Sequence, residues 1–216
     1  MRGDIVLCHG FGFDRDYWDS LIPYFSDYNI YNMDLGYYGR KTTTLPTLKS
    51  RKTIGIGHSL GFLKLAQLNL EFDLLVGLNP FLNFLGNQKE LRRKRQLEFK
   101  MLKSSMNLSP KETLESFHLR CGASFDYEKF QNVSLRSLIE DLDYISYEHP
   151  KPNAKEILIL ASEDDPVVPK ALTLELIKPE FSHIRVEFLE TGFHALGSLH
   201  SEWVQRKIKG HIDGNL

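Results

Sequence analysis

Short apolar runs separated by longer amphipathic segments constrain the fold of this chain more than any other feature. Six runs have the length of a strand: Ile5–Cys8, Ile30–Met33, Thr53–Ile56, Leu74–Leu78, Ile157–Ala161 and Val186–Leu189. Several are almost wholly apolar, as expected for parallel strands buried on both faces. Helical periodicity is found between them, in Tyr17–Phe25, Leu60–Leu70, Lys170–Ile177 and Ser201–Ile208. The alternation predicts an α/β fold with a doubly wound, mostly parallel central sheet flanked by helices.

The alternation stops between residues 81 and 154. This stretch has no apolar run typical of a buried strand, but Leu91–Leu102 and Leu135–Ile145 have helical periodicity. Ser109 and Pro110 are typical of an N-cap and of the first residue of a helix, and Pro150 and Pro152 mark the end of the stretch. We expect residues 1–80 and 155–216 to form the core, and residues 81–154 to form a small helical lid insertion.

A candidate nucleophile lies between a predicted strand and a predicted helix. Gly57-His58-Ser59-Leu60-Gly61 matches the G-x-S-x-G nucleophile elbow, a sharp turn that lifts a serine hydroxyl out of the sheet. The glycines allow neighbouring backbone to approach without a clash against Cβ atoms. The alternative is a strand-to-helix turn without chemistry, but the apolar run before Ser59 and the helical pattern after it favour the elbow.

A serine nucleophile requires a base, and the base requires an orienting acid. His194 follows the last predicted strand, and Glu163, Asp164 and Asp165 follow the strand before it. Because parallel strands end at the same edge of a sheet, these side chains are expected near Ser59, at the edge where ligands bind in open α/β sheets.

Four motifs in this order resemble those of the α/β-hydrolase family, in particular its serine esterases with a lid. His9–Gly12 resembles the oxyanion loop and Gly57–Gly61 the nucleophile elbow. Asp165–Pro169 resembles the acid loop, and Gly192–Ala195 resembles the histidine loop. The motifs span almost the whole chain, and the order serine, acid, histidine is that of the family.

The resemblance implies a catalytic triad and an oxyanion hole. The triad would be Ser59, Asp165 and His194, with Asp165 as the acid because it begins the family's D-x-x-V-P motif. The backbone amides of Phe11 and Leu60 would bind the oxyanion. The implied reaction is hydrolysis of a carboxylic ester or thioester, which requires neither a metal nor a cofactor.

Three departures from the family pattern leave the substrate class open. The first strand begins at residue 4 or 5, where the family usually has a β-hairpin first. Asp34–Arg40 lacks the proline of the usual D-x-P-G-x-G-x-S segment, and the insertion is short for a lid.

The remaining histidines and cysteines favour structural roles. We expect His58 to pack beside the nucleophile and His9 to brace the oxyanion loop. The other histidines lack the spacing of zinc ligands, so no metal site is predicted. Cys8 and Cys121 lack an elbow, and two cysteines cannot build a disulfide framework. They are typical of a reducing compartment, which favours the cytoplasm.

A basic cluster lies in the insertion. Residues 87–103 contain seven basic and two acidic side chains, a local charge of +5. One interpretation is a solvated helix face. The other is a surface through which Arg92, Arg93 and Arg95 bind an anionic carrier. The small chain, its helical insertion and this cluster are similar to the pimeloyl-acyl-carrier-protein methyl ester esterases of biotin synthesis, which implies an acyl-carrier protein as partner.

Charge and hydropathy exclude other classes of protein. The whole chain has a formal charge of −1, which gives no support to bulk binding of nucleic acid. No apolar stretch is long enough for a membrane span or a secretory signal, so we expect a soluble, cytoplasmic protein. Three alternatives to the carrier-linked ester remain: a general short-acyl carboxylesterase, a C–C hydrolase or lyase, and a receptor that binds its ligand without turnover.

Overall fold

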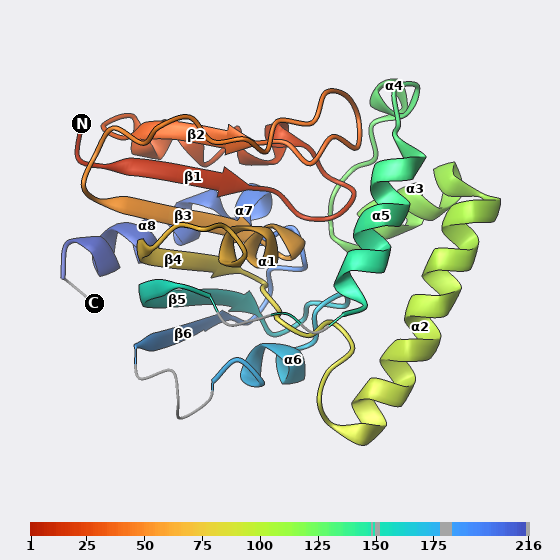
Figure 1. Cartoon of the computed structure of the whole chain (residues 1–216). Helices are drawn as coiled ribbons and strands as arrows, with labels where there is room; N and C mark the ends of the chain where they lie inside the picture. Colours follow the sequence, from red (N-terminus) through yellow and green to blue (C-terminus); the bar gives the residue numbers. More distant parts are fainter. Residues whose placement is uncertain (148, 150–151, 178–182, 215–216) are drawn as a thin grey trace.

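A six-stranded, wholly parallel sheet forms the centre of the molecule (Figure 1). The computed structural model describes residues 1–147, 149, 152–177 and 183–214. The strands are β1 (Asp4–Cys8), β2 (Asn29–Met33), β3 (Thr53–His58), β4 (Phe72–Leu78), β5 (Ala154–Ser162) and β6 (Ile184–Leu189). They are arranged in the order β2-β1-β3-β4-β5-β6, which confirms the predicted doubly wound sheet.

Helices cover both faces of this sheet and its carboxyl edge. The core helices are α1 (Leu60–Ala66), α6 (Lys170–Leu174), α7 (Leu196–Leu199) and α8 (Ser201–Ile212). Between β4 and β5 the chain forms α2 (Lys89–Leu108), α3 (Pro110–Arg120), α4 (Tyr127–Phe130) and α5 (Leu135–Ile145). Helix α1 lies on one face of the sheet and α8 on the other, while α2, α3 and α5 stand beyond the carboxyl ends of the strands (Figure 1). No helix among the described residues has the length and apolar composition needed to cross a membrane.

Two predicted helices are longer in the structure: Leu91–Leu102 lies within α2 (Lys89–Leu108), and Ser201–Ile208 lies within α8 (Ser201–Ile212). Three others are divided or shorter. Residues 17–25 form two short 3₁₀ helices, Arg15–Trp18 and Ile22–Phe25, because Pro23 has no N–H to continue a single helix. Helix α1 ends at Ala66, where Gln67 and Leu68 bond back to Lys64 and Leu65 in a tighter turn. Helix α6 ends at Leu174 rather than at residue 177.

Helix starts in the insertion follow local capping. The α5 helix has the predicted bounds, and the Ser134 side chain caps it by accepting from Ser137 N–H. Helix α3 begins at Pro110 as predicted, although the Ser109 side chain makes no capping hydrogen bond. The short α4 helix was not predicted; Asp126 starts it by accepting from Glu128 and Lys129. Pro150 lies outside the described residues.

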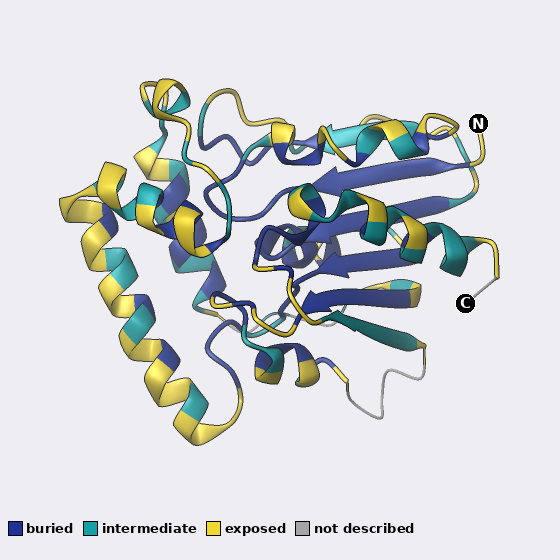
Figure 2. Cartoon of the chain, turned by 180° about the vertical axis from the view of Figure 1, so that it is seen from behind, coloured by how far each residue is buried: buried dark blue, intermediate teal, exposed yellow. Residues whose placement is uncertain are grey.

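Burial separates the central strands from the edges of the sheet. Strands β1 and β3 are buried along their whole length, whereas the edge strands β2 and β6 are mostly half-buried (Figure 2). Helices α2 and α8 turn one apolar side inward and a polar side to solvent (Figure 2). The two free cysteines, Cys8 and Cys121, are both buried.

The register of the sheet places the loops after the strands side by side. Cys8 pairs with Gly57, His58 with Leu78, Leu78 with Leu160, and Ser162 with Leu189. The chain therefore leaves β1, β3, β4, β5 and β6 at one edge of the sheet. Residues that follow these strands converge there.

The turn between β3 and α1 packs against neighbouring backbone at two glycines. A Cβ atom added to Gly61 would lie 2.0 Å from the Cys8 carbonyl oxygen. At Gly57 the added atom would lie 2.4 Å from the backbone of Phe62. Because backbone on both sides leaves no flexible atom to move away, only glycine fits either position.

We predict that Gly61→Ala lowers the free energy of unfolding by about 3 kcal/mol, the upper end of the usual cost of overpacking. The added methyl group must push α1 away from the end of β1. Gly39→Ala is the matched control, because nothing lies within 4 Å of a Cβ atom there. Urea denaturation should show a change of no more than about 0.5 kcal/mol for the control. Equal stability of the two variants would contradict the close packing.

Candidate active site

Ser59 occupies a strained position directly after β3. Its backbone has φ 51° and ψ −118°, a conformation that residues other than glycine rarely adopt. The Ser59 N–H donates to Leu78 O at the end of β4, at 2.9 Å. The residue is only 4% exposed. This geometry is the sharp strand-to-helix turn that the glycine pattern predicted.

His194 and Asp165 form a buried pair at the same edge. His194 Nδ1 lies 2.7 Å from Asp165 Oδ2, and both side chains are almost fully buried. Asp165 Oδ1 accepts from the Val167 and Val168 N–H groups. Because a carboxylate can only accept, Nδ1–H of His194 donates a hydrogen bond to Oδ2, and the Nε2 lone pair of His194 remains free to act as a base.

Ser59 and His194 are linked by the contact between His194 and His58, the residue that precedes Ser59. The ring of His58, the residue before Ser59, lies 4.7 Å from the His194 ring. Within the described part of the chain, no hydrogen bond joins the Ser59 hydroxyl to the His194 ring. Such contacts are often formed only when substrate binds.

Asp164 holds the loop that carries His194. Its Oδ1 accepts from Gly192 N at 2.9 Å and from Phe193 N at 3.0 Å. Phe193 has φ 53°, and these bonds hold that strained backbone. Of the acids considered in the sequence, Asp165 therefore contacts the histidine ring and Asp164 contacts its loop.

Asn79 is a functional candidate that the sequence analysis missed. Its Nδ2 donates to Phe193 O at 2.8 Å and to His194 O at 2.9 Å, while its Oδ1 accepts from Ser162 N at 2.8 Å. The residue is 1% exposed and has φ 47°. The available signal was its place directly after a predicted strand. Asn79 ties the histidine loop to the end of β5.

The predicted oxyanion donors follow two neighbouring strands, β3 and β1. Leu60 is the first residue of α1, and Phe11 follows β1. In the described residues, neither backbone N–H has an acceptor within the protein. Two free amides beside the strained serine are suited to bind a developing negative charge.

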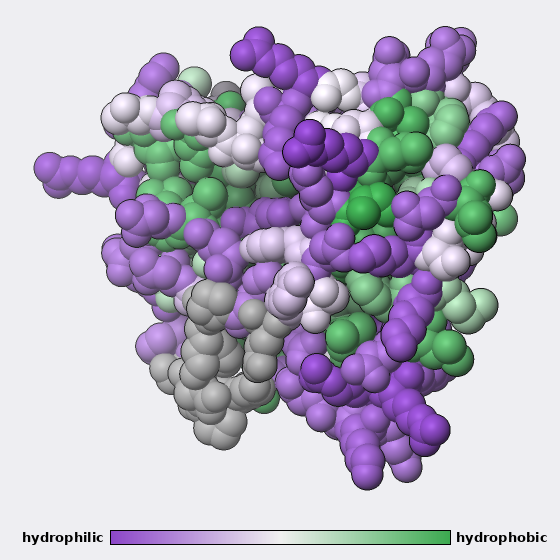
Figure 3. Space-filling view, turned by 45° about the vertical axis from the view of Figure 1, so that its right-hand side comes forward, coloured by the Kyte–Doolittle hydropathy of each residue, from purple (hydrophilic) through white to green (hydrophobic). Residues whose placement is uncertain are grey.

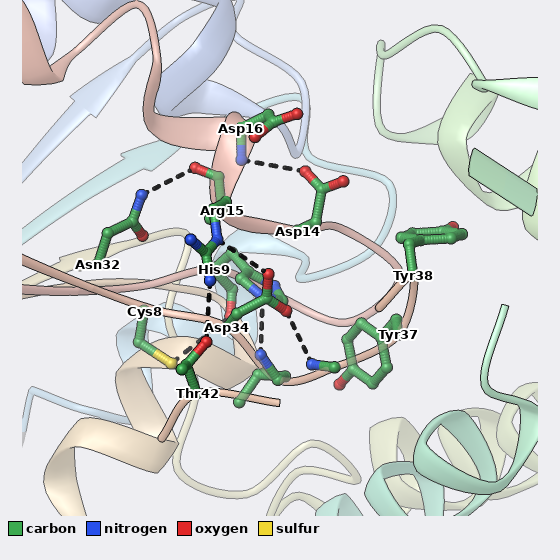
Figure 4. Close-up of polar contacts among 12 residues, drawn as sticks. Cys8, His9, Asp14, Arg15, Asp16, Asn32, Asp34, Tyr37, Tyr38 and Thr42 are labelled. Atoms are coloured by element: carbon green, nitrogen blue, oxygen red, sulfur yellow. Dashed lines mark hydrogen bonds and ion pairs between the residues drawn. The ribbon is translucent and has the colours of Figure 1, made fainter. Parts of the chain in front are cut away.

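His9 braces the loop that presents Phe11 (Figure 4). Its Nδ1 donates to Gly10 O at 2.9 Å, and its Nε2 accepts from Leu35 N at 3.0 Å. Burial alone would raise the pKa of Asp34, but the contact with the His9 ring at 3.5 Å, the hydrogen bond from Gly36 N–H and that from Arg15 outweigh burial and lower this pKa to about 2. A permanent carboxylate therefore stands beside His9.

His58 and the cysteines are unsuited to acid–base or nucleophilic roles. Burial, followed by the nearby charge of His194, lowers the pKa of His58 well below its usual value. The neutral ring donates from Nε2 to His194 O at 2.9 Å and stacks on Tyr17. Burial raises the pKa of the Cys8 thiol to about 12 and also raises that of Cys121, so both remain protonated at neutral pH.

The three arginines of the basic cluster differ in their exposure to solvent. Arg92 and Arg93 are exposed on α2, whereas Arg95 is 4% exposed and lies against Phe84. Arg95 is therefore not part of an exposed basic surface. Its helical spacing from Leu91 and Phe99, both partly or fully buried, is the sequence signal for this inward position.

Metal coordination is not built into the described residues. Across residues 1–147, 149, 152–177 and 183–214, no three histidine, cysteine, aspartate or glutamate side chains are grouped to hold an ion.

Similarity to known proteins is seen in structure rather than in sequence. No protein-family model and no curated protein sequence matches this chain. A bromoperoxidase from Bacillus anthracis has a TM-score of 0.80 at 14% identity, over 99% of this chain and 92% of that chain. An esterase from Exiguobacterium antarcticum has a TM-score of 0.75 at 12% identity, over 98% and 93%.

A lipase-esterase related protein from Clostridium acetobutylicum is similar over 96% of this chain and 93% of that chain, with a TM-score of 0.66 and 17% identity. At these identities the likeness establishes the fold. The chain has the α/β-hydrolase fold, as the sequence motifs predicted.

We predict that Asn79→Gly lowers the rate of any reaction that uses His194 by about tenfold to a hundredfold, the scale of a catalytic group misplaced by 1 Å. Glycine keeps the positive φ and removes only the amide. The effect should fall on kcat rather than KM, measured well below the unfolding temperature of the variant. An unchanged kcat would contradict the positioning role.

Asn79→Asp supplies an independent readout for the same residue. A carboxylate beside His194 O favours the charged imidazolium, so the acidic limb of the kcat/KM profile should move to higher pH. An unmoved limb would contradict the close placement of residue 79 beside His194.

Proposed function

We propose that the protein is a serine hydrolase that cleaves carboxylic esters or thioesters. The observation that carries the proposal is the strained Ser59 elbow at the same sheet edge as the buried His194–Asp165 pair. A non-glycine residue at positive φ and a buried carboxylate beside an imidazole each cost folding free energy. Strained backbone of this kind is found mainly at functional sites. Esterases among the structurally similar proteins support the proposal.

The mechanism follows from the donors and acceptors present. His194 Nε2 removes the Ser59 proton as Oγ attacks the carbonyl carbon, and Asp165 stabilises the resulting imidazolium. The Phe11 and Leu60 amides bind the oxyanion. His194 then protonates the leaving alcohol or thiol, and afterwards activates the water that hydrolyses the acyl-enzyme. No step requires a metal or a cofactor.

Other reaction classes are carried by the same fold. The structurally similar proteins include a bromoperoxidase and an epoxide hydrolase from Bacillus megaterium, so the fold alone does not choose the reaction. A C–C hydrolase or lyase would use the same three side chains, and a receptor would bind without turnover. Ester hydrolysis is favoured by the esterases among the structurally similar proteins and by the two backbone amides without an acceptor in the described residues, which follow β1 and Ser59.

We expect the wild-type protein to hydrolyse 4-nitrophenyl esters and Ser59→Ala to lose about 10⁴-fold or more in kcat, as other serine hydrolases do without their nucleophile. Release of 4-nitrophenolate measures the rate. Ser162→Ala is the matched control, since the Ser162 hydroxyl is buried without a partner in the described structure. Activity of Ser59→Ala within tenfold of wild type would place the nucleophile elsewhere. Absence of turnover in the wild type would favour the receptor.

A finer proposal concerns an acyl-carrier protein as the source of the ester, as in pimeloyl-acyl-carrier-protein methyl ester esterases. Arg92 and Arg93 are exposed on the first half of α2 together with Lys89 and Lys94, and Lys100 is exposed near the middle of the helix. Figure 3 brings this side of the molecule forward; hydrophilic side chains gather along its lowest edge on the right, below a mixed surface with hydrophobic patches. Residues 81–154 would then form the lid, with α2 receiving the acidic carrier.

We predict that charge reversal in Arg92→Glu/Arg93→Glu raises KM for a carrier-linked ester by roughly twofold to thirtyfold, since each exposed ion pair contributes about 0.2–1 kcal/mol. Hydrolysis of the free methyl ester should not change. Added salt should reproduce the effect for the carrier substrate alone. Arg136→Glu, at an exposed arginine on α5, is the control. Equal changes for both esters would contradict docking at this surface.

A further inference from the structure

A cavity of about 540 Å³ lies between α2, α3 and the loop that carries Asp165. Its volume is within the range of small-molecule sites, roughly 300–1,000 Å³. Its apolar lining consists of Phe84, Phe99, Met101, Leu102, Phe117 and Val167. Four charged side chains also line it: Arg95, Glu98, Glu112 and Arg120.

Two lining residues connect the cavity to the candidate active site. The Phe117 ring lies 5.5 Å from the ring of Phe11 and 6.5 Å from that of His194. Val167 donates its N–H to Asp165 Oδ1 at 2.7 Å. Two residues of the cavity lining therefore lie next to the oxyanion loop, the candidate base and its acid.

Arg95 is a buried cation whose compensation is incomplete. Its Nε donates to Phe84 O at 3.3 Å, and its Nη1 pairs with Glu98 at 3.1 Å. Within the described part of the chain, its buried Nη2 has no partner. The Arg95 side chain is 5% exposed, whereas Glu98 is 42% exposed and also faces Lys94 at 3.9 Å. Buried charges are normally paired and fully hydrogen-bonded.

The charges around Arg95 favour the binding of an additional anion. Burial lowers the pKa of Arg95 by more than the carboxylate of Glu98 raises it, and Arg120, a second cation on the same cavity, acts in the same direction as burial. Arg120 itself donates to Pro166 O at 2.9 Å on the acid loop. Glu112 is exposed. Asp165 is a buried carboxylate whose charge favours the Arg95 cation, but its oxygens are already bonded to His194, Val167 and Val168.

We propose that this cavity binds the acyl chain of the substrate and that Arg95 recognises a carboxylate at the far end of that chain. The inference rests on the proposed ester hydrolysis and deepens it. The substrate class is the half-ester of a dicarboxylic acid: the ester reaches Ser59, the methylene chain passes Phe117 and contacts the aromatic lining, and the free carboxylate bonds to the guanidinium. A charge-assisted bond in this apolar environment selects strongly for the anion.

The test compares two series of 4-nitrophenyl esters of equal chain length. One series consists of half-esters of dicarboxylic acids from succinate to sebacate, and the other consists of neutral monocarboxylic esters. The wild type should prefer half-esters at one intermediate length. Arg95→Met should lower kcat/KM for these half-esters by about tenfold to a hundredfold and change the neutral esters by less than twofold. Arg136→Met is the control.

We expect Glu98→Gln to strengthen the binding of half-esters at the same site, the opposite of the effect of Arg95→Met. Removal of the carboxylate that occupies Nη1 leaves Arg95 freer to bind substrate, so KM for half-esters should fall several-fold. A purely structural role for the Arg95–Glu98 pair predicts no such gain. The proposal is overturned if the wild type shows no preference for half-esters, or if Arg95→Met affects both series equally.

Failure of the proposed function would be recognised separately. If the wild type hydrolyses neither series, calorimetric titration of suberate into wild type and Arg95→Met tests the subsite without turnover. Binding that is lost in Arg95→Met supports the anion site, and equal or absent binding overturns it. A carrier-linked ester has no free carboxylate, so the half-ester series also separates this cavity from the exposed surface of α2.

Discussion

The close approach of the β3–α1 turn to the end of β1 is the contact on which the candidate site depends. Gly61 lies so near the Cys8 carbonyl that a methyl group has no room there. This approach brings the first amide of α1 beside the loop after β1, where Phe11 lies. The same turn forces Ser59 to positive φ. One steric constraint thus positions the candidate nucleophile and both candidate oxyanion donors.

The second half of the site is assembled by hydrogen bonds between distant segments. Asn79 after β4, Asp164 after β5 and His58 at the end of β3 all bond to the loop of residues 192–194. These contacts hold His194 from three strands at once, and Asp165 adds the bond to its ring. If His194 is the base, as we propose, its ring loses little conformational freedom during reaction, which is the basis of preorganised catalysis.

The sequence predicted the features that depend on local pattern. All six strands were found because buried parallel strands are continuous apolar runs, and α5 was found because its apolar period and its cap agree. The helix expected at residues 17–25 was wrong because the periodicity outweighed Pro23. Ser59, Asp165 and His194 lie at one edge because parallel strands share their direction.

Contacts between segments far apart in the chain could not be predicted from one sequence. Asn79 and His194 are separated by 115 positions, and no local signal pairs them. Arg95 was grouped with Arg92 and Arg93 by charge alone. Its spacing from Phe99 placed it on the inner side of α2, where packing against Phe84 and not charge decides its surroundings. The substrate preference likewise depends on the shape and charge of a cavity that only the folded chain forms.

The proposed mechanism requires a covalent acyl group on Ser59 during turnover. Rapid quenching of the wild type during hydrolysis of a 4-nitrophenyl ester, followed by peptide mass spectrometry, detects this group. We expect one acyl group on the peptide that contains Ser59, which forms at the rate of 4-nitrophenolate release and disappears as the ester is exhausted. Product release without an adduct at Ser59, or an adduct at another residue, would contradict it.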